Sequence, residues 1–127
     1  MRELVKVYKV LSDESRLRVL SLLFEKECCV CEVVQTLGIS QSKASRILSA
    51  LYDVGFLKLR KEGLWSLYSI DYDGMNEYMK EVLEATGKAL EGIRQIETDR
   101  EQLKNTRRTG SKSANNMCRI NPVPQES

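Results

Sequence analysis

Two short helical segments joined by a tight turn constrain the fold of this chain most strongly. In residues 30–37 apolar side chains recur at positions i, i+3, i+4 and i+7, and the same spacing returns between Ala44 and Leu51. Gly38 is suited to end the first helix, and Ser40 can cap the second. Since a short helix, a glycine-containing turn and a second helix make a helix-turn-helix, we predict that motif here.

The flanking segments extend the motif on both sides. Residues 2–24 fit two helices divided at Ser12 and Asp13, both of which are good caps for the second helix. Residues 56–70 are strand-like, and Glu62 and Gly63 interrupt them as the charged tip of a β-hairpin. This order of elements predicts a mainly α-helical fold with a β-hairpin wing, the winged helix-turn-helix.

The second helix of the motif and the hairpin carry candidate DNA contacts. Residues 40–70 hold five basic and two acidic side chains, whereas residues 71–103 hold four basic and nine acidic ones. In such a motif the second helix enters the major groove, and basic side chains nearby contact phosphates. A polar helix face is also typical of ordinary solvated helices, so the interpretation depends on the order of the elements. The base-edge candidates are Gln41, Ser42 and Ser45, the phosphate candidates on the helix are Lys43 and Arg46, Ser49 shares their face, and the hairpin adds Lys58, Arg60 and Lys61.

A heptad stripe follows the hairpin. It runs from Met75 to Ile96 at alternating spacings of four and three, and such a stripe needs a partner. Gly87 and Gly92 each weaken a helix by ~1 kcal/mol, so packing must hold it. We expect a long C-terminal helix that forms a homodimer together with the N-terminal helix. Residues 1–103 are then one DNA-binding and dimerisation domain, and residues 104–127 are expected to be a disordered basic tail.

The stretch "ECCVCE", residues 27–32, gathers three of the four cysteines. Placed on the first helix of the motif, Cys29 and Cys31 flank the apolar stripe and Cys28 lies on its far side, which favours a function over simple packing. Cys28 and Cys31 would share a helix face. Cys29 and Cys31 would point apart, so a ligand that binds both would unwind the start of this helix, which no Ser, Thr, Asp or Asn caps.

Composition limits what these thiols bind. The chain has no histidine, which excludes imidazole sites for zinc, nickel or cobalt, and it has no second cysteine pair to complete a zinc site. Clustered thiolates suit soft ions, and three suit a trigonal one. We expect a soluble, cytoplasmic protein with reduced thiols, since no signal peptide or membrane span is visible and no membrane partner is implied. No βαβ pattern or anion-cradling loop accompanies the thiols, so we expect no enzyme and no resident cofactor.

Four stretches together resemble the ArsR/SmtB family of metalloregulatory repressors: "LSDESRLRVLSLL", "ECCVCEV", "GISQSKASRILSALYDVGFL" and "RKEGLWSLYSI". The resemblance covers about residues 3–72. The cysteine stretch is similar to the family's E-L-C-V-C-D-L box, with Glu27 at its Glu, Cys29 and Cys31 at its cysteines and Glu32 at its Asp.

The resemblance implies a homodimer that binds double-stranded operator DNA and releases it when As(III) or Sb(III) binds the cysteines. Where a third cysteine can follow in such sensors this chain has Val34, so the third ligand is Cys28, which we favour, Cys118 or a non-protein group. Cadmium and lead sensors add an N-terminal cysteine-bearing arm, which is missing before Cys28. A redox or persulfide switch on the same thiols stays open, because Cys28 and Cys31 have C-x-x-C spacing.

Overall fold

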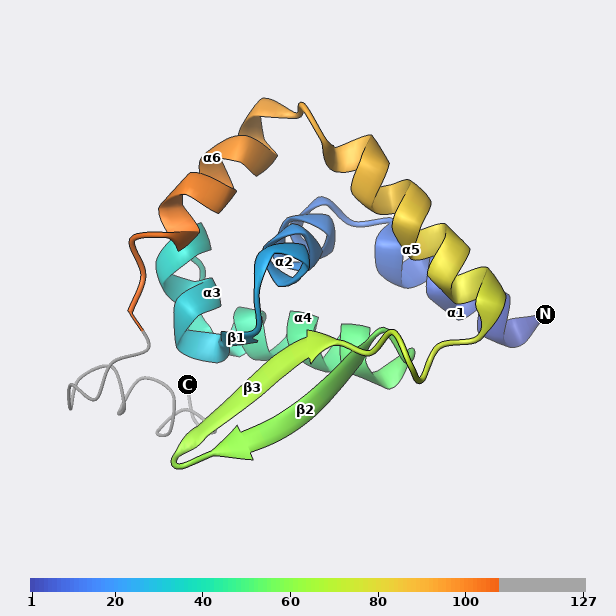
Figure 1. Ribbon diagram of the computed structural model, residues 1–127, viewed down its shortest axis with the longest axis horizontal. Helices are drawn as coiled ribbons and strands as arrows, with labels where there is room; N and C mark the ends of the chain where they lie inside the picture. Colours follow the sequence, from blue (N-terminus) through green and yellow to red (C-terminus); the bar gives the residue numbers. More distant parts are fainter. Residues whose placement is uncertain (108–127) are drawn as a thin grey trace.

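The computed structural model describes residues 1–107, and within them it contains six helices and three strands (Figure 1). The helix-turn-helix lies beside a small antiparallel sheet, and two further helices follow the sheet. The predictions for residues 108–127, which include Cys118 and most of the expected disordered tail, lie outside the described residues. The elements are α1 (Arg2–Leu11), α2 (Glu14–Glu25), β1 (Cys28–Cys29), α3 (Val30–Leu37), α4 (Gln41–Asp53), β2 (Leu57–Glu62), β3 (Trp65–Ile70), α5 (Glu77–Leu90) and α6 (Arg94–Leu103).

The predicted caps form. The side chain of Asp13 accepts a hydrogen bond from the backbone N–H of Arg16 at 3.0 Å, at the start of α2. Ser40 does the same for Lys43 at 3.0 Å, at the start of α4. Gly38 ends α3 with a φ of 66°, a left-handed conformation that glycine adopts without strain. These local signals therefore define the helix-turn-helix that the sequence predicts.

The core lies between the motif and the rest of the domain. The predicted stripe of α4 is buried from Ala44 to Leu51, and Val33 of α3 meets it with no exposed surface. Leu20 of α2 and Phe56, just before β2, complete this part of the core with no exposed surface. Burying apolar side chains of this size contributes about 1.5–3 kcal/mol each, so the packing fixes α4 on its neighbours.

The sheet has one strand more than the predicted hairpin. Its order is β1-β3-β2 with both pairs antiparallel, and β2 and β3 form the expected hairpin with Gly63 in its turn. The added strand, β1, pairs Cys28 with Tyr68 and Cys29 with Leu67. The segment before α3 is therefore part of the wing sheet.

The prediction of one long C-terminal helix is wrong. The chain forms α5 and α6 instead, because Gly92 takes a φ of 81° between them and Ile93 is extended. Figure 1 shows α6 folded back from α5, and α6 packs against α2 and α3. Ile96 and Leu103 are the apolar side chains that α6 buries. Met75, Met79 and Ile96 of the heptad stripe are thus buried within the domain, whereas Ala89 and Ile93 are exposed.

A membrane-spanning helix is not found among residues 1–107, because none of their helices is both long and apolar enough.

Candidate DNA-binding face and cysteine site

The exposed face of α4 carries most of the predicted DNA contacts. Ser42, Lys43, Arg46 and Ser49 are exposed, and Ser45 is half-buried. A hollow of about 270 Å³ lies between α4 and the start of α2. Lys43 and Arg46 line it from α4, and Arg16 lines it from α2. This arginine was not among the predicted contacts. Basic side chains around such a hollow are suited to hold phosphate.

Gln41 departs from its prediction as a base-edge residue. It is only 8% exposed, because it precedes Ala44 by three residues and so falls on the buried stripe that continues to Leu48 and Leu51. Its Oε1 atom is buried with no hydrogen-bond partner. The spacing alone could have placed Gln41 on the core side of α4.

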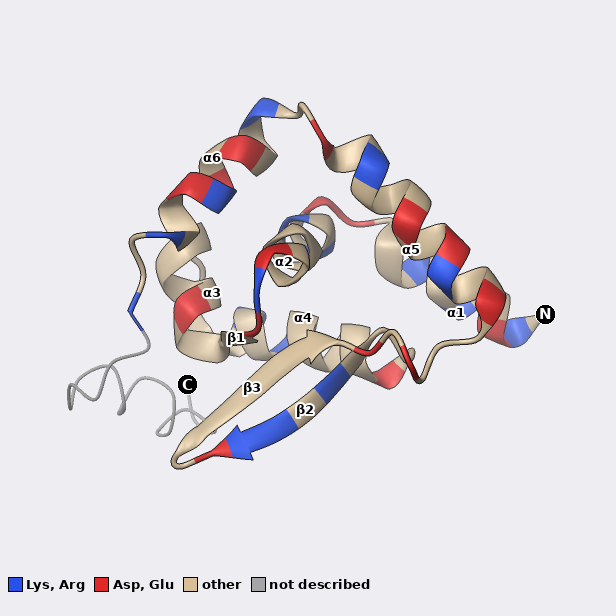
Figure 2. Cartoon of the chain, viewed as in Figure 1, with Lys and Arg blue, Asp and Glu red and all other residues tan. Residues whose placement is uncertain are grey.

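The basic residues of the wing lie along β2 (Figure 2). Successive strand residues point to opposite faces, so Lys58 and Arg60 share one face and Lys61 lies on the other. Lys61 donates a hydrogen bond to Oγ of Ser66 at 2.7 Å. The Arg60 guanidinium donates to both carboxylate oxygens of Glu27, at 2.7 and 2.8 Å. The wing is thus connected to the cysteine stretch.

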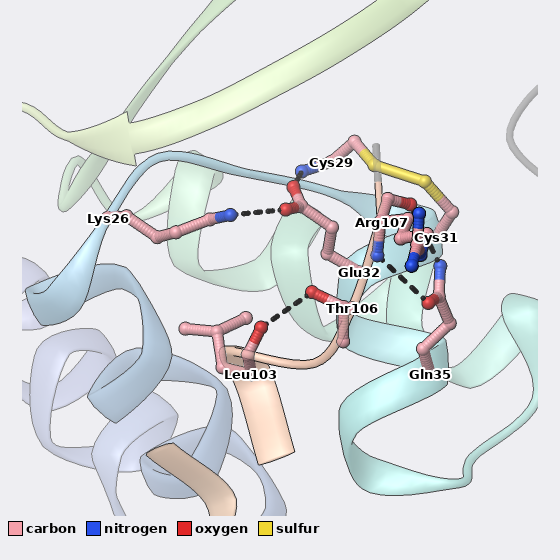
Figure 3. The surroundings of a disulfide bond; sticks show 8 residues. All are labelled: Lys26, Cys29, Cys31, Glu32, Gln35, Leu103, Thr106 and Arg107. Carbon is pink, nitrogen blue, oxygen red and sulfur yellow. Dashed lines mark hydrogen bonds and ion pairs between the residues drawn. A yellow bond between two sulfur atoms is a disulfide. The ribbon is translucent and has the colours of Figure 1, made fainter. Parts of the chain in front are cut away.

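Cys29 and Cys31 are joined as a disulfide at the junction of β1 and α3 (Figure 3). Cys31 lies on α3 as predicted, but the placement of Cys28 and Cys29 on this helix is wrong, because α3 begins only at Val30. The backbone of Cys29 is extended, with φ −93° and ψ 170°, and Cys29 is the N-cap residue of α3. Its sulfur can therefore meet that of Cys31 while α3 stays intact, and no unwinding is needed.

Cys28 lies apart from this pair. Neighbouring strand residues point to opposite faces, and Cys28 is buried in the main core cluster, whereas Cys29 and Cys31 pack with Leu67 and Trp65. Its thiol donates to the carbonyl of Lys26 at 3.4 Å. Within residues 1–107 no three histidine, cysteine or acidic side chains gather as a metal site. The structure thus brings together two of the three predicted ligands.

Glu32 supports the cysteine pair, a role that the sequence interpretation missed. Its carboxylate has no exposed surface; one oxygen accepts the backbone N–H of Cys29 at 2.9 Å and the other lies 2.6 Å from Nζ of Lys26. An acidic residue three positions after the cap is typical of a capping box, so the spacing from Cys29 to Glu32 is a signal that could have been used. The start of α3 is therefore capped.

The cysteine pair is buried. Cys29 is 1% exposed and Cys31 has no exposed surface.

On the other face of the sheet, burial raises the pKa of Tyr68, the partner of Cys28 in the strand pairing, so this phenol stays neutral. On α3, one turn after Cys31, the amide of Gln35 makes two hydrogen bonds of 3.2 Å with the backbone of Arg107 (Figure 3).

Comparison with known proteins agrees with this geometry. The family described as "Bacterial regulatory protein, arsR family" matches residues 13–59, which hold α2, the cysteine stretch, α3 and α4. The "Arsenic resistance transcriptional regulator ArsR2" of Pseudomonas putida is 38% identical over 65% of this chain and 72% of its own length. The chain belongs to the ArsR family of bacterial regulatory proteins.

Another relative is named for a different metal. The "Cadmium resistance transcriptional regulatory protein CadC homolog" of Staphylococcus aureus is 37% identical over 65% of this chain, which spans 65% of that relative's length. A solved structure, "Reduced HlyU from Vibrio cholerae N16961", has a TM-score of 0.58 and 27% identity, covering 69% of this chain and 88% of that one. The family is one of transcription regulators, which supports the expectation that this chain is not an enzyme. These relatives thus belong with regulators named for different metals or metalloids.

Proposed function

We propose that this ArsR-family chain is an As(III)- or Sb(III)-responsive repressor that binds operator DNA as a homodimer. The main observation in support is that the sulfur atoms of Cys29 and Cys31 lie together at the edge of the wing sheet. A reduced pair in this place offers two soft thiolate ligands to one thiophilic ion, and binding through both releases their protons. The metalloid would then bridge the end of β1 and the first turn of α3.

A trigonal ion needs a third ligand, and the buried Cys28 does not face the pair. Cys28 would have to leave the main core to reach it, so we propose Cys29 and Cys31 as the essential ligands. The third position is then open to Cys28, to Cys118 or to a non-protein thiol. A tetrahedral thiolate site needs four ligands, which residues 1–107 do not supply at this site.

The DNA contacts follow from the exposed face of α4. We propose that Ser42, Ser45 and Ser49 face base edges, and that Lys43 and Arg46 contact phosphates along with Lys58, Arg60 and Lys61 of the wing. Gln41 is left out of this set because it is buried. One such module makes a small interface, and two copies that read two half-sites would increase both affinity and specificity.

A dimer surface is available on α1 and α5. Leu4, Val5 and Tyr8 of α1 are 37%, 43% and 56% exposed, and a groove of about 620 Å³ runs between α1 and Tyr78 and Val82 of α5. Exposed apolar side chains that cluster around a groove are typical of a protein interface. We propose that a second copy of this chain covers this surface.

The function is tested with cysteine variants in a DNA-release assay. Purified reduced protein on its promoter fragment is treated with arsenite, and release is followed by fluorescence anisotropy of the DNA. Replacing both Cys29 and Cys31 with serine should abolish release while leaving DNA affinity intact, and Cys28→Ala should preserve release. Full release from the double variant would refute the proposal, and loss in Cys28→Ala alone would assign the third position to Cys28.

A second candidate is a redox switch, which the disulfide between Cys29 and Cys31 favours. A peroxide that oxidises the two thiols to the disulfide would take their two electrons and two protons, so that hydrogen peroxide is reduced to water and an organic hydroperoxide to an alcohol and water. Release of DNA by peroxide and its reversal by dithiothreitol, with no response to arsenite, would favour this candidate over the metalloid.

A further inference from the structure

Three residues form one row across the wing sheet. Cys29 of β1 pairs with Leu67 of β3, and Leu67 pairs with Arg60 of β2. Residues directly opposite one another in antiparallel strands place their side chains on the same face of the sheet. Glu27 precedes Cys29 by two residues and reaches Arg60 across that face. The cysteine pair and the wing arginine therefore share one face of one sheet.

The guanidinium of Arg60 already contacts two carboxylates in this structure. Both oxygens of Glu27 accept its hydrogen bonds, and Glu62 lies 2.8 Å away on the same strand. The hydrogen bonds that Arg60 donates to Glu27, and next those to Glu62, raise the pKa of Arg60 above its ordinary value. A phosphate binds a guanidinium through the same pair of donors as a carboxylate does. Glu27 and a DNA phosphate are thus alternative partners of Arg60.

We propose that Glu27 competes with DNA phosphate for Arg60 and so transmits the state of Cys29 and Cys31 to the wing. The inference rests on the proposed function. With the two cysteines held together, as in this structure, β1 keeps Glu27 against Arg60 and the wing loses a phosphate contact. When the thiols are reduced and empty, β1 lets Glu27 withdraw and Arg60 turns to the DNA. The alternative is that the ion pair of Glu27 and Arg60 only holds β1 against the wing, whatever the state of the cysteines.

The experiment compares Glu27→Gln with Glu62→Gln, because each removes one negative charge that contacts Arg60. DNA affinity is measured for reduced protein with and without arsenite, at several salt concentrations. Trp65, the only tryptophan of the chain, packs against the cysteine pair, so its fluorescence reports occupancy independently of DNA. Glu27→Gln should strengthen binding in the arsenite-loaded state by about threefold to tenfold, and less in the empty state. Glu62→Gln should change both states alike.

An Arg60→Gln background decides between the two roles of the ion pair. If Glu27 acts through Arg60, adding Glu27→Gln to Arg60→Gln changes neither the affinity nor the response to arsenite. An unchanged ratio of the two affinities in Glu27→Gln, with normal Trp65 quenching, would overturn the inference and leave the proposed function standing. Wild-type protein that keeps its DNA in arsenite would instead refute the proposed function, whatever the variants do.

Discussion

The carboxylate of Asp99 on α6 accepts two hydrogen bonds from the guanidinium of Arg18 on α2, at 2.8 and 2.9 Å. Asp99 is only 2% exposed, and Gln95 donates a further hydrogen bond to it at 2.9 Å. The hydrogen bond with Asp99 also raises the pKa of Arg18. A charged pair of this kind fixes where α6 lies on α2.

Replacing Asp99 with alanine should lower the free energy of unfolding by about 2–4 kcal/mol, since Arg18 would lose its partner in a partly buried place. Urea unfolding followed by circular dichroism measures this change. Glu101→Ala, which breaks an exposed pair with Lys104 on the same helix, is the control and should change stability little. Equal effects of both variants would show that the Arg18 pair does not hold α6.

Charge placed on the proposed dimer surface should separate the two copies. Leu4→Glu together with Tyr8→Glu would bury charge against apolar partners, so a monomer is expected in light scattering and the affinity for a two-half-site operator should fall at least tenfold. Leu64→Glu at the hairpin turn, 59% exposed, is the control and should leave the dimer intact. A dimer that survives both changes on α1 would place the interface elsewhere.

Arg46 should supply affinity without sequence preference. Arg46→Gln should weaken binding to operator and to unrelated DNA alike, and it should reduce the slope of log affinity against log salt by about one. Gln41→Met, which alters a buried side chain on the opposite side of α4, should leave the slope unchanged. A loss confined to the operator in Arg46→Gln would mean that this side chain reads bases.

Stability should decline at alkaline pH through Tyr68. Its pKa is raised by burial above the ordinary 10.0, so the folded state binds its proton more tightly than the unfolded state does. That contribution is complete below the unfolded pKa and is lost as the pH rises through the folded pKa. Urea unfolding at a series of pH values should show a shallower alkaline decline in Tyr68→Phe, whereas Tyr72→Phe, 55% exposed, should behave like wild type.

The parts of the fold that the sequence predicted rest on local chemistry. Asp13 and Ser40 cap helices through hydrogen bonds to residues three positions ahead, and Gly38 ends a helix with a single conformation. The stripe of α4 follows from helical spacing alone. Each of these features is determined within a few residues of sequence, so a pattern can reveal it.

The parts that the sequence did not predict depend on distant residues. The backbone of Cys29 is extended because β1 pairs with β3, nearly 40 residues further on, and that pairing takes Cys28 and Cys29 off the helix. The heptad pattern from Met75 to Ile96 is continuous, yet the chain turns at Gly92 because α6 finds partners on α2 and α3. The cysteine site is therefore a product of tertiary pairing, although its residues are adjacent in sequence.

Ligand binding at Cys29 and Cys31 is proposed to control DNA binding, and a single titration can test this coupling. Arsenite is added to the reduced protein on its promoter fragment while DNA anisotropy and Trp65 fluorescence are recorded together. Both signals should change in parallel and reach their end at about one equivalent per subunit, with affinity for DNA falling by roughly 5–150-fold. A fluorescence change that is complete while the DNA stays bound would contradict it.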